Sequence, residues 1–186
     1  MAKDFYMACL DVAGRRCVVV GGGSVGLEKA SGLAACGASV AVVSPDLDPR
    51  FADLGVEWTR RRYRTGDLEG AFIAIAATSD RSVNEHVFAD AEKRGMLCNV
   101  ADVPDLCNFI LPAVHREGPI AVAVSTGGAS PALAKRLRSQ IAELVRPEHA
   151  ELAEELRAMR PEVKERFETY EERRDYFEDV VTARLA

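Results

Sequence analysis

The stretch RCVVVGGGSVG, which spans Arg16 to Gly26, decides the fold of this chain. Its first five residues are mostly β-branched, as in a buried strand. Its end fits the pattern G-x-G-x-x-G at Gly21, Gly23 and Gly26. Further along, apolar residues at helical spacing between Lys29 and Ala34 predict a helix after the glycines.

A second strand completes the unit. The helix is expected to stop at Gly37, and Ser39 to Val43 is again apolar and β-branched. Such crossovers are right-handed, so the two strands are expected to be parallel. A glycine motif between a strand and a helix predicts a Rossmann-like α/β domain that binds a dinucleotide. The alternative is a glycine turn with a structural role alone.

The glycines have separate roles in this prediction. Gly21 permits a tight turn, Gly23 lets the backbone approach a pyrophosphate, and Gly26 allows the helix to pack closely. Ser24 and Val25 open the helix, where free amides face the phosphates. A P-loop would need Gly-Lys followed by Ser or Thr, which the residues after Gly26 do not supply.

The end of the second strand predicts which dinucleotide binds. The strand leads into Ser44, and Asp46 lies 20 residues after Gly26. A carboxylate there accepts hydrogen bonds from ribose hydroxyls and repels a 2′-phosphate, which favours NAD. Arg50 nearby leaves NADP open, and Asp46 also fits a simple turn.

Two later strands are expected to end at the same edge of the sheet. Ala71–Ala77 and Leu97–Val100 are apolar runs, separated by a helix that begins near Asp80 and stops at Gly95. Ligands of such folds bind at the carboxyl ends of the strands. We therefore expect four polar residues to line the crevice: Thr78, Ser79, Asn99 and Asp102. Taken alone, Asp102 is also consistent with a turn residue.

The following segment changes character. Phe109–Leu111 and Ile120–Val124 are predicted strands, and Ser130 is a good cap for a helix that begins at Pro131 and runs to about Val145. Between them, the loop Ser125-Thr126-Gly127-Gly128 offers amides to a carboxylate or is an ordinary turn. Two basic patches are candidate anion contacts or solvated faces: Arg60–Arg62 with Arg64, and Lys135, Arg136 and Arg138.

Composition excludes several classes of protein. The chain has 186 residues with 48% hydrophobic and 28% charged residues, so one main soluble domain with an appendage is expected. Its net charge of −5 argues against nucleic acid as a partner. Five cysteines without a C-x-x-C pair indicate reduced thiols in a cytoplasm, and no signal peptide or membrane span is expected. The three histidines lack ligand spacing, so no metal site is predicted.

The charge is concentrated in the tail. Residues 147–186 contain 12 acidic and 7 basic residues, which accounts for the whole net charge. A helical segment is expected there, broken or bent at Pro161. Its apolar residues are spaced to share one helix face: Leu152, Leu156, Met159, Val163, Phe167 and Tyr170. Such a face packs on the same chain or on a partner subunit.

Several blocks together resemble the precorrin-2 dehydrogenase and sirohydrochlorin ferrochelatase family of sirohaem synthesis. They cover nearly the whole chain. Cys98–Asp102 and Val124–Ala134 are the specific ones and Phe109–Ala113 matches between them, whereas the glycine block is shared by many NAD proteins. Where some members have serine, this chain has Thr126.

The resemblance implies a function and a division of the chain. The expected reaction is oxidation of precorrin-2 to sirohydrochlorin by NAD, with Asp102 as the base, followed in many members by insertion of Fe²⁺. The Ser125 to Gly128 loop and the arginines would meet substrate carboxylates. The implied parts are an NAD-binding domain at 1–111, a dimerisation segment at 112–146 and a C-terminal helical domain at 147–186, in a homodimer.

Three functions remain open from the sequence. They are a dehydrogenase with chelatase activity, a dehydrogenase alone, and an NAD-sensing module without chemistry. The inserted metal, Fe²⁺ or Co²⁺, and the later use of the product are also open. A sensor would need the glycine loop but neither Asp102 nor the block after Ser125.

Overall fold

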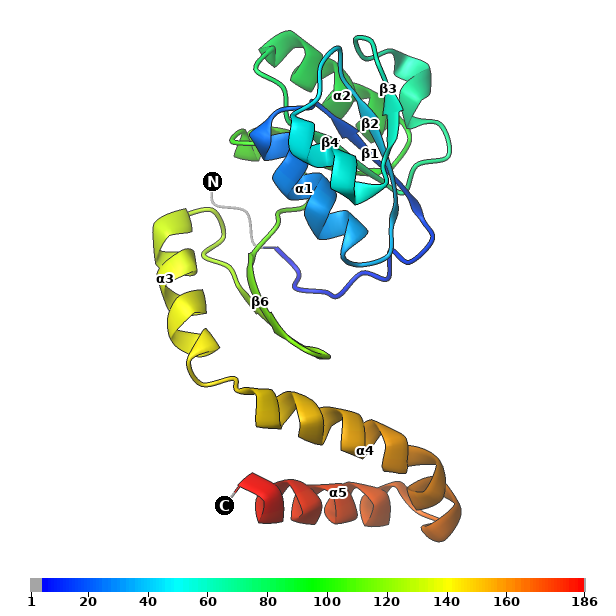
Figure 1. Ribbon diagram of the computed structural model, residues 1–186, viewed down its shortest axis with the longest axis vertical. Helices are drawn as coiled ribbons and strands as arrows, with labels where there is room; N and C mark the ends of the chain where they lie inside the picture. The colour runs from blue at the N-terminus through cyan, green and yellow to red at the C-terminus, as the bar shows by residue number, and fades with distance from the viewer. Residues whose placement is uncertain (1–4, 186) are drawn as a thin grey trace. The chain divides into compact units, whose positions relative to one another are not determined.

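The computed structural model describes residues 5–185 and divides into two units, Met1–Ile110 and Leu111–Ala186 (Figure 1). The first unit holds a five-stranded, all-parallel sheet with the strand order β3-β2-β1-β4-β5. Its strands are β1 (Arg16–Val20), β2 (Ser39–Val43), β3 (Glu57–Thr59), β4 (Ile73–Ala76) and β5 (Leu97–Val100). Its helices are α1 (Ser24–Ala34), α2 (Arg81–Lys93) and the 3₁₀ segments η1 (Pro49–Leu54), η2 (Thr65–Leu68) and η3 (Pro104–Leu106).

Both faces of the central strands are buried, because α1 and α2 cover opposite faces of the sheet (Figure 1). Alternate residues of β1 enter two separate cores. Val18 and Val20 pack in the cluster that contains α2 residues, whereas Cys17 and Val19 pack with α1 and η1. This explains why β1 is continuously apolar, as expected for a parallel sheet covered on both sides.

The strand order reverses between β1 and β4. From β1 the chain moves through α1 to β2 and β3 on one side, and then returns to place β4 and β5 on the other. The carboxyl ends of β1 and β4 therefore flank the topological switch point, where open α/β sheets bind their ligands.

Most expected elements of the first unit are present. The bounds predicted for β1, β2 and β5 agree with the structure, and β4 lies within the predicted run 71–77. Edge strand β3 has no counterpart in the prediction. Its residues are Glu57, Trp58 and Thr59, and all three are at least partly exposed, so no apolar pattern marks the strand.

The predicted strand at Phe109–Leu111 is wrong. The chain there runs beside β5, but side chains satisfy the edge of the strand. The Asn108 amide accepts from the Cys98 N–H at 2.7 Å and donates to the Met96 carbonyl at 2.8 Å, and the Asn99 amide donates to the Phe109 carbonyl at 3.1 Å. Side-chain bonds thus take the place of a sixth strand.

The second unit contains an antiparallel hairpin of β6 (Ala113–Glu117) and β7 (Ile120–Val124). Three helices follow: α3 (Pro131–Ala142), α4 (Pro147–Arg166) and α5 (Tyr170–Leu185). Strand β7 and α3 were expected, and Ser130 caps α3 by accepting from the Leu133 N–H at 3.2 Å. Strand β6 was missed because His115, Arg116 and Glu117 interrupt its apolar pattern.

The tail is helical, but its break lies elsewhere than expected. Helix α4 continues through Pro161 to Arg166, and the chain leaves helical geometry at Phe167. An interior proline removes one intrahelical hydrogen bond and favours a kink, but here it does not end the helix. The single predicted apolar face is therefore divided: Leu152 and Val163 are buried on α4, whereas Tyr170 begins α5 and is exposed.

A buried carboxylate joins α2 to the segment before η2. Asp90 is 2% exposed, and its carboxylate accepts from the Tyr63 hydroxyl at 2.9 Å and lies 3.2 Å from His86 Nε2. Burial opposes ionisation of Asp90, but hydrogen bonds from Tyr63 and Thr65 outweigh this effect, so its pKa lies below the ordinary value. The network therefore stabilises the ionised form.

We expect Tyr63→Phe to lower the free energy of unfolding by about 1.5 kcal/mol at pH 7, because a bond to a charged carboxylate is lost. A lowered folded-state pKa adds stability above the unfolded value of about 3.9, and this stability is lost as the pH falls through the folded pKa. The difference between the variant and the parent should therefore shrink below about pH 4. Urea unfolding at pH 7 and pH 3 measures it.

Tyr6→Phe provides the control for this prediction, because Tyr6 is 95% exposed and loses the same atom. Equal stability of the parent and Tyr63→Phe at pH 7 would contradict the role of the network.

Candidate functional site

The segments that follow β1, β4 and β5 lie side by side at the carboxyl edge of the sheet. Backbone pairing continues one residue past each strand: Ala77 N–H donates to the Val20 carbonyl at 2.8 Å, and Ala101 N–H donates to the Ala76 carbonyl at 2.9 Å. On the other side, Gly21 N–H donates to the Val43 carbonyl at 3.0 Å. Asn99 lies within β5, and the other predicted site residues of the first unit follow the ends of β1, β2, β4 and β5.

Three glycines in the loop after β1 are required by close backbone contacts. A Cβ on Gly21 would lie 2.3 Å from the Ala77 carbonyl oxygen, and one on Gly26 would lie 2.1 Å from the Gly21 oxygen. Gly21 also has φ = +120°, a value that residues with a side chain rarely adopt. Gly22, which the motif does not single out, is equally constrained, because its Cβ would lie 2.1 Å from the Asp46 oxygen.

Gly23 differs from its neighbours because it faces open space. A Cβ there would meet no heavy atom within 4 Å, and Gly23, Ser24 and Val25 are exposed. Gly23 is the N-cap of α1, yet no side chain caps the helix. The first-turn amides are therefore available to an anion, as in dinucleotide-binding loops. The loop fits a pyrophosphate, because its inner side packs closely against the backbone and no side chain covers its outer side.

The end of β2 presents one unpaired carboxylate and one paired carboxylate. Arg50 holds Asp48 with two bonds, of 2.9 and 2.7 Å, and these hydrogen bonds lower the pKa of Asp48 to about 2. Asp46 is exposed and has no hydrogen bond or ion pair with any residue in 5–185. Ser44 is 8% exposed, with its carbonyl bonded to the Trp58 indole. Asp46 is thus free for ribose hydroxyls, while Arg50 is occupied by Asp48.

The segment after β4 is organised by a residue that the site prediction does not include. Asn84 on α2 is 6% exposed; its carbonyl oxygen accepts from the Thr78 hydroxyl at 2.8 Å, and its amide donates to the Thr78 carbonyl at 2.9 Å. The Asp80 side chain caps α2. Ser79, between them, is exposed. The Thr78 hydroxyl therefore fixes the loop shape, and Ser79 is the more accessible of the two.

Asp102 stands out at the end of β5. It has φ = +60° and is the one non-glycine residue with a positive φ among residues 5–185. A left-handed conformation costs about 1–2 kcal/mol in a residue with a Cβ, and such residues cluster at functional sites. Its carboxylate is exposed and has no hydrogen bond or ion pair within the described chain. By contrast, neighbouring Asn99 is 8% exposed, and its amide is bonded within the protein.

The arginine patch after β3 is partly structural. Arg61 binds Asp67 through two bonds, of 2.8 and 2.6 Å, and lowers the pKa of that carboxyl. Arg60 lies over the Trp58 ring, 5.5 Å from its centroid. Arg61 is therefore a weaker candidate for an external anion than the sequence indicates.

The Ser125 to Gly128 loop belongs to the second unit. Thr126 Oγ accepts from the Ser130 N–H at 3.0 Å and lies 3.1 Å from the Ser130 carbonyl, so it closes the loop before α3. Ser125 Oγ accepts from the Gly127 N–H at 3.2 Å. Gly127 and Gly128 have φ of +61° and +87°, which explains the glycine pair.

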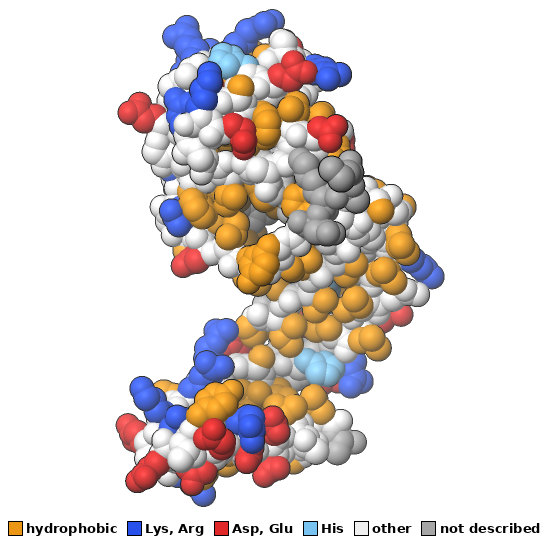
Figure 2. Space-filling model, turned by 180° about the vertical axis from the view of Figure 1, so that it is seen from behind, with side chains coloured by type: hydrophobic (Ala, Val, Ile, Leu, Met, Phe, Trp, Pro, Cys, Tyr) orange, Lys and Arg blue, Asp and Glu red, His pale blue; other side chains and the backbone are white. Residues whose placement is uncertain are grey.

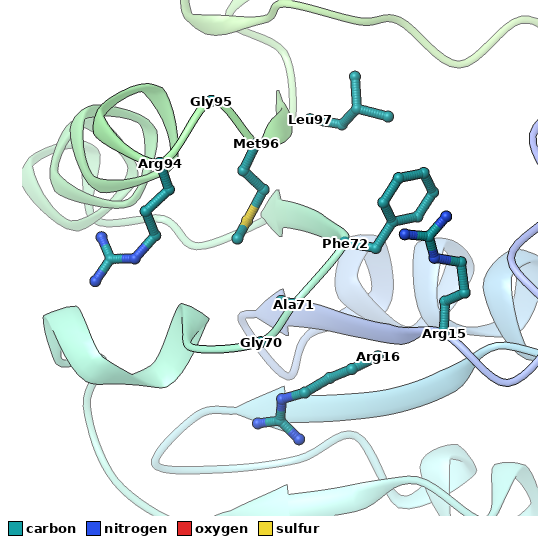
Figure 3. Close-up of a pocket in the computed structure, with 9 residues that line it drawn as sticks. All are labelled: Arg15, Arg16, Gly70, Ala71, Phe72, Arg94, Gly95, Met96 and Leu97. Atoms are coloured by element: carbon teal, nitrogen blue, oxygen red, sulfur yellow. The ribbon is translucent and has the colours of Figure 1, made fainter.

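Each unit contains a cavity, and that of the first unit lies away from the carboxyl edge of the sheet. One, of about 340 Å³, lies at the opposite edge, where β1, β4 and β5 begin; Arg15 stacks on Phe72 there at 3.5 Å, and the guanidinium groups of Arg15, Arg16 and Arg94 point in different directions (Figure 3). The other, of about 670 Å³, lies between α4 and α5. Neither contains a predicted site residue.

Within 5–185, no three His, Cys, Asp or Glu side chains are grouped so that they could hold a metal ion. No helix in the same range is both long and apolar enough to cross a membrane.

Family models match three consecutive parts of the chain. They are described as putative NAD(P)-binding, at residues 8–113; sirohaem biosynthesis protein central, at 117–144; and sirohaem synthase dimerisation region, at 148–186. The dimerisation model thus covers the part expected to be a C-terminal helical domain, and the central model covers the part expected to mediate dimerisation. The division at residues 111 and 146 stays a prediction.

Individual proteins give a consistent result. The siroheme synthase of Methylobacillus flagellatus is 42% identical, with 89% of this chain and 36% of the relative covered, and that of Chromobacterium violaceum is 40% identical, with 98% and 40% covered. The chain thus spans about two fifths of the length of these curated relatives. The solved structure of SirC, a precorrin-2 dehydrogenase, superposes with a TM-score of 0.81 at 26% identity, over 98% of this chain and 93% of that one.

Replacing Gly23 should separate NAD binding from folding. Gly23→Asp places a carboxylate where the pyrophosphate is expected, so we expect the Kd for NAD to rise at least about 100-fold. The melting temperature should change by less than about 2 °C, because the new side chain meets open space. Isothermal titration calorimetry and thermal unfolding measure the two effects.

Two variants complete this test. Gly32→Asp adds the same charge on an open face of α1 and should leave the affinity unchanged. Gly26→Ala should lower the melting temperature, because its Cβ collides with the backbone. Normal NAD affinity in Gly23→Asp would show that the loop is not the pyrophosphate site.

Proposed function

The chain belongs to the sirohaem-biosynthesis family that joins an NAD(P)-binding module to sirohaem synthase central and dimerisation segments, and from this premise we propose that it oxidises precorrin-2 to sirohydrochlorin with NAD. The single observation that carries the proposal is the position of Asp102. An exposed, unpaired carboxylate is held in left-handed geometry at the end of β5. SirC, whose solved structure resembles this chain closely, is itself titled a precorrin-2 dehydrogenase.

Strand order supports a division of the carboxyl edge into two halves. Asp46 follows β2, on one side of the glycine loop, and is suited to the adenosine ribose. The other half of the dinucleotide would extend over β4 and β5. Two strand spacings of about 4.8 Å place the end of β5 about 10 Å from β1, within the span of a dinucleotide. Asp102 therefore lies on the side expected for the nicotinamide.

The reaction requires one hydride and one proton to leave precorrin-2. Bound NAD would accept the hydride. Asp102 would accept the proton, as a general base within reach of the macrocycle. Because its carboxylate has no partner in the chain, no internal bond must break before it acts. The glycine loop and Asp46 would orient the cofactor, which brings the reacting groups together.

The substrate has carboxylates around its rim, and the second unit offers groups that fit them. The Ser125 to Gly128 loop has two exposed glycines in left-handed geometry, Gly127 and Gly128. Lys135 and Arg136 on α3 are exposed and lie in the helix that follows this loop. We assign this loop and these cations to substrate carboxylates.

Insertion of Fe²⁺ is a second candidate activity. The relatives that match this chain are named siroheme synthases, and sirohaem contains iron. Insertion of a metal requires the pyrrole N–H protons to leave, and the unpaired Asp102 carboxylate is suited to accept them as well. One carboxylate would then serve both steps, with Fe²⁺ as a substrate.

The surface of the second unit supports a homodimer. One face of the hairpin carries exposed Val114, Ala121 and Ala123, and α3 exposes Leu133 and Leu137. Figure 2 shows hydrophobic side chains gathered on the part of the surface that the hairpin and α3 form. Helix α3 packs on the hairpin, and a partner subunit would bury the apolar side chains that both leave exposed. The chain would act in the cytoplasm, where thiols stay reduced. Cys98 is one such thiol, and burial raises its pKa to about 12.

Purified protein, precorrin-2 and NAD test the dehydrogenase directly. We expect NADH absorbance and the sirohydrochlorin spectrum to appear together. Asp102→Asn should lower kcat at least about 100-fold, because the base is removed, while the Kd for NAD changes less than about twofold.

The control is Asp105→Asn, which removes the same charge from an exposed position three residues away and should retain activity. Full activity of Asp102→Asn would remove this residue from the mechanism. NAD binding without turnover in the parent protein would favour the sensor.

The chelatase is tested separately with sirohydrochlorin and Fe²⁺ or Co²⁺ under anaerobic conditions. We expect the protein to accelerate the spectral change that marks metal insertion, and Asp102→Asn to abolish the acceleration. A rate equal to that without protein would leave the dehydrogenase alone.

A further inference from the structure

Cys107 lies beneath the turn that carries Asp102. It is 3% exposed and follows η3, within the core cluster that contains Val100. Because the side chain is buried and the chain uses it in no reaction proposed above, its role must be sought in the contacts that it makes.

The Cys107 thiol is bonded to both ends of the turn. Its sulfur accepts from the Val100 N–H at 3.3 Å and from the Asn99 amide at 3.5 Å. The sulfur also lies 3.3 Å from the Val100 carbonyl oxygen and 3.3 Å from the Val103 carbonyl oxygen, and its single proton can be donated to either. The thiol thus links the last residue of β5 to the residue after Asp102.

The turn is also restrained by its backbone, because Ala101 N–H donates to the Ala76 carbonyl at 2.9 Å and Leu106 N–H donates to the Val103 carbonyl at 3.0 Å. Val103 N–H donates to the Val100 carbonyl at 3.3 Å, a long bond, and the Asp102 side chain has no bond within the described chain. Yet Asp102 is held at φ = +60°, which costs about 1–2 kcal/mol. Surrounding contacts must offset this cost, and the Cys107 bonds lie directly on either side of it.

The residue after Cys107 holds the same segment in register. Asn108 N–H donates to the Cys98 carbonyl at 3.1 Å, and the Asn108 side chain donates to the Met96 carbonyl at 2.8 Å. The segment that carries Cys107 is therefore aligned along β5, and this places the thiol beside Val100.

We propose that Cys107 is a positioning residue for Asp102: its buried thiol holds Val100 and Val103 so that the carboxylate projects from a left-handed turn. This inference rests on the proposed function, in which Asp102 is the base. A small misplacement of a reacting group can cost a large factor in rate, so loss of the thiol should reduce turnover without affecting the glycine loop.

Two substitutions at this position test the proposal. Cys107→Ala removes every thiol bond, and we expect kcat for precorrin-2 oxidation to fall about 10- to 100-fold, with the Kd for NAD unchanged. Cys107→Ser keeps one donor and one acceptor on the side chain, so it should recover kcat to within about fivefold of the parent.

A matched control separates positioning from loss of stability. Cys17 on β1 is also fully buried, but it lies at the opposite end of its strand from the glycine loop. Cys17→Ala should lower the melting temperature as Cys107→Ala does, yet leave kcat unchanged. An equal loss of kcat in both variants would overturn the proposal.

The Asp102→Asn background provides a second test. If Cys107 acts through Asp102, Cys107→Ala should cause no further loss of the residual rate once Asp102 is Asn. A further loss of the same factor in this background would show that Cys107 does not act through Asp102.

Crystal structures of the parent, Cys107→Ala and Cys107→Ser decide the geometry without an activity assay. We expect residue 102 to leave the left-handed region in Cys107→Ala and to keep it in Cys107→Ser. An unchanged Asp102 in Cys107→Ala would overturn the proposal. Absence of turnover in the parent would instead contradict the proposed function, so the two failures are distinguishable.

Discussion

The first unit depends on a backbone-to-backbone contact that only glycine permits. At Gly21 the chain passes so close to the Ala77 carbonyl that a Cβ would lie 2.3 Å from its oxygen, and at Gly26 the start of α1 rests on the Gly21 carbonyl. These contacts bring the ends of β1 and β4 together at the point where the strand order reverses. They also leave the outer surface of the loop, at Gly23, without side chains.

The two halves of the carboxyl edge differ in how their polar groups are used. Around the glycine loop, backbone amides and the free Asp46 carboxylate face outward, while Asp48 neutralises Arg50. At the end of β5, most polar groups are bonded within the protein, and the Asp102 carboxylate is free. One half is therefore suited to hold a dinucleotide and the other to present a single reactive group.

The segment Cys107-Asn108 both protects the edge of β5 and contacts the turn that carries the proposed base, Asp102. Parallel sheets have exposed backbone at their edge strands, and proteins commonly cover it. Here an asparagine amide and a cysteine thiol satisfy β5 in place of another strand. The same contacts extend to the turn at Asp102, so one segment both covers the edge of β5 and supports the candidate site.

The amino-acid sequence alone determined the elements whose cause is local. The β-branched run and spaced glycines predicted β1, α1 and β2, because burial on both faces and a tight turn impose residue types at fixed positions. Ser130 followed by proline predicted the start of α3 for the same reason. The polar residues at strand ends could be identified because parallel strands end at one edge.

Tertiary structure decided what depends on residues distant along the chain. Strand β3 is defined by its pairing with β2, and the segment at Phe109 by side-chain bonds to β5. The roles of Gly22, Asn84 and Cys107 also became visible only in three dimensions. Their partners are Asp46, Thr78 and Val100, and no local pattern of apolar residues or turns records such contacts, because each depends on where the folded backbone places a single atom.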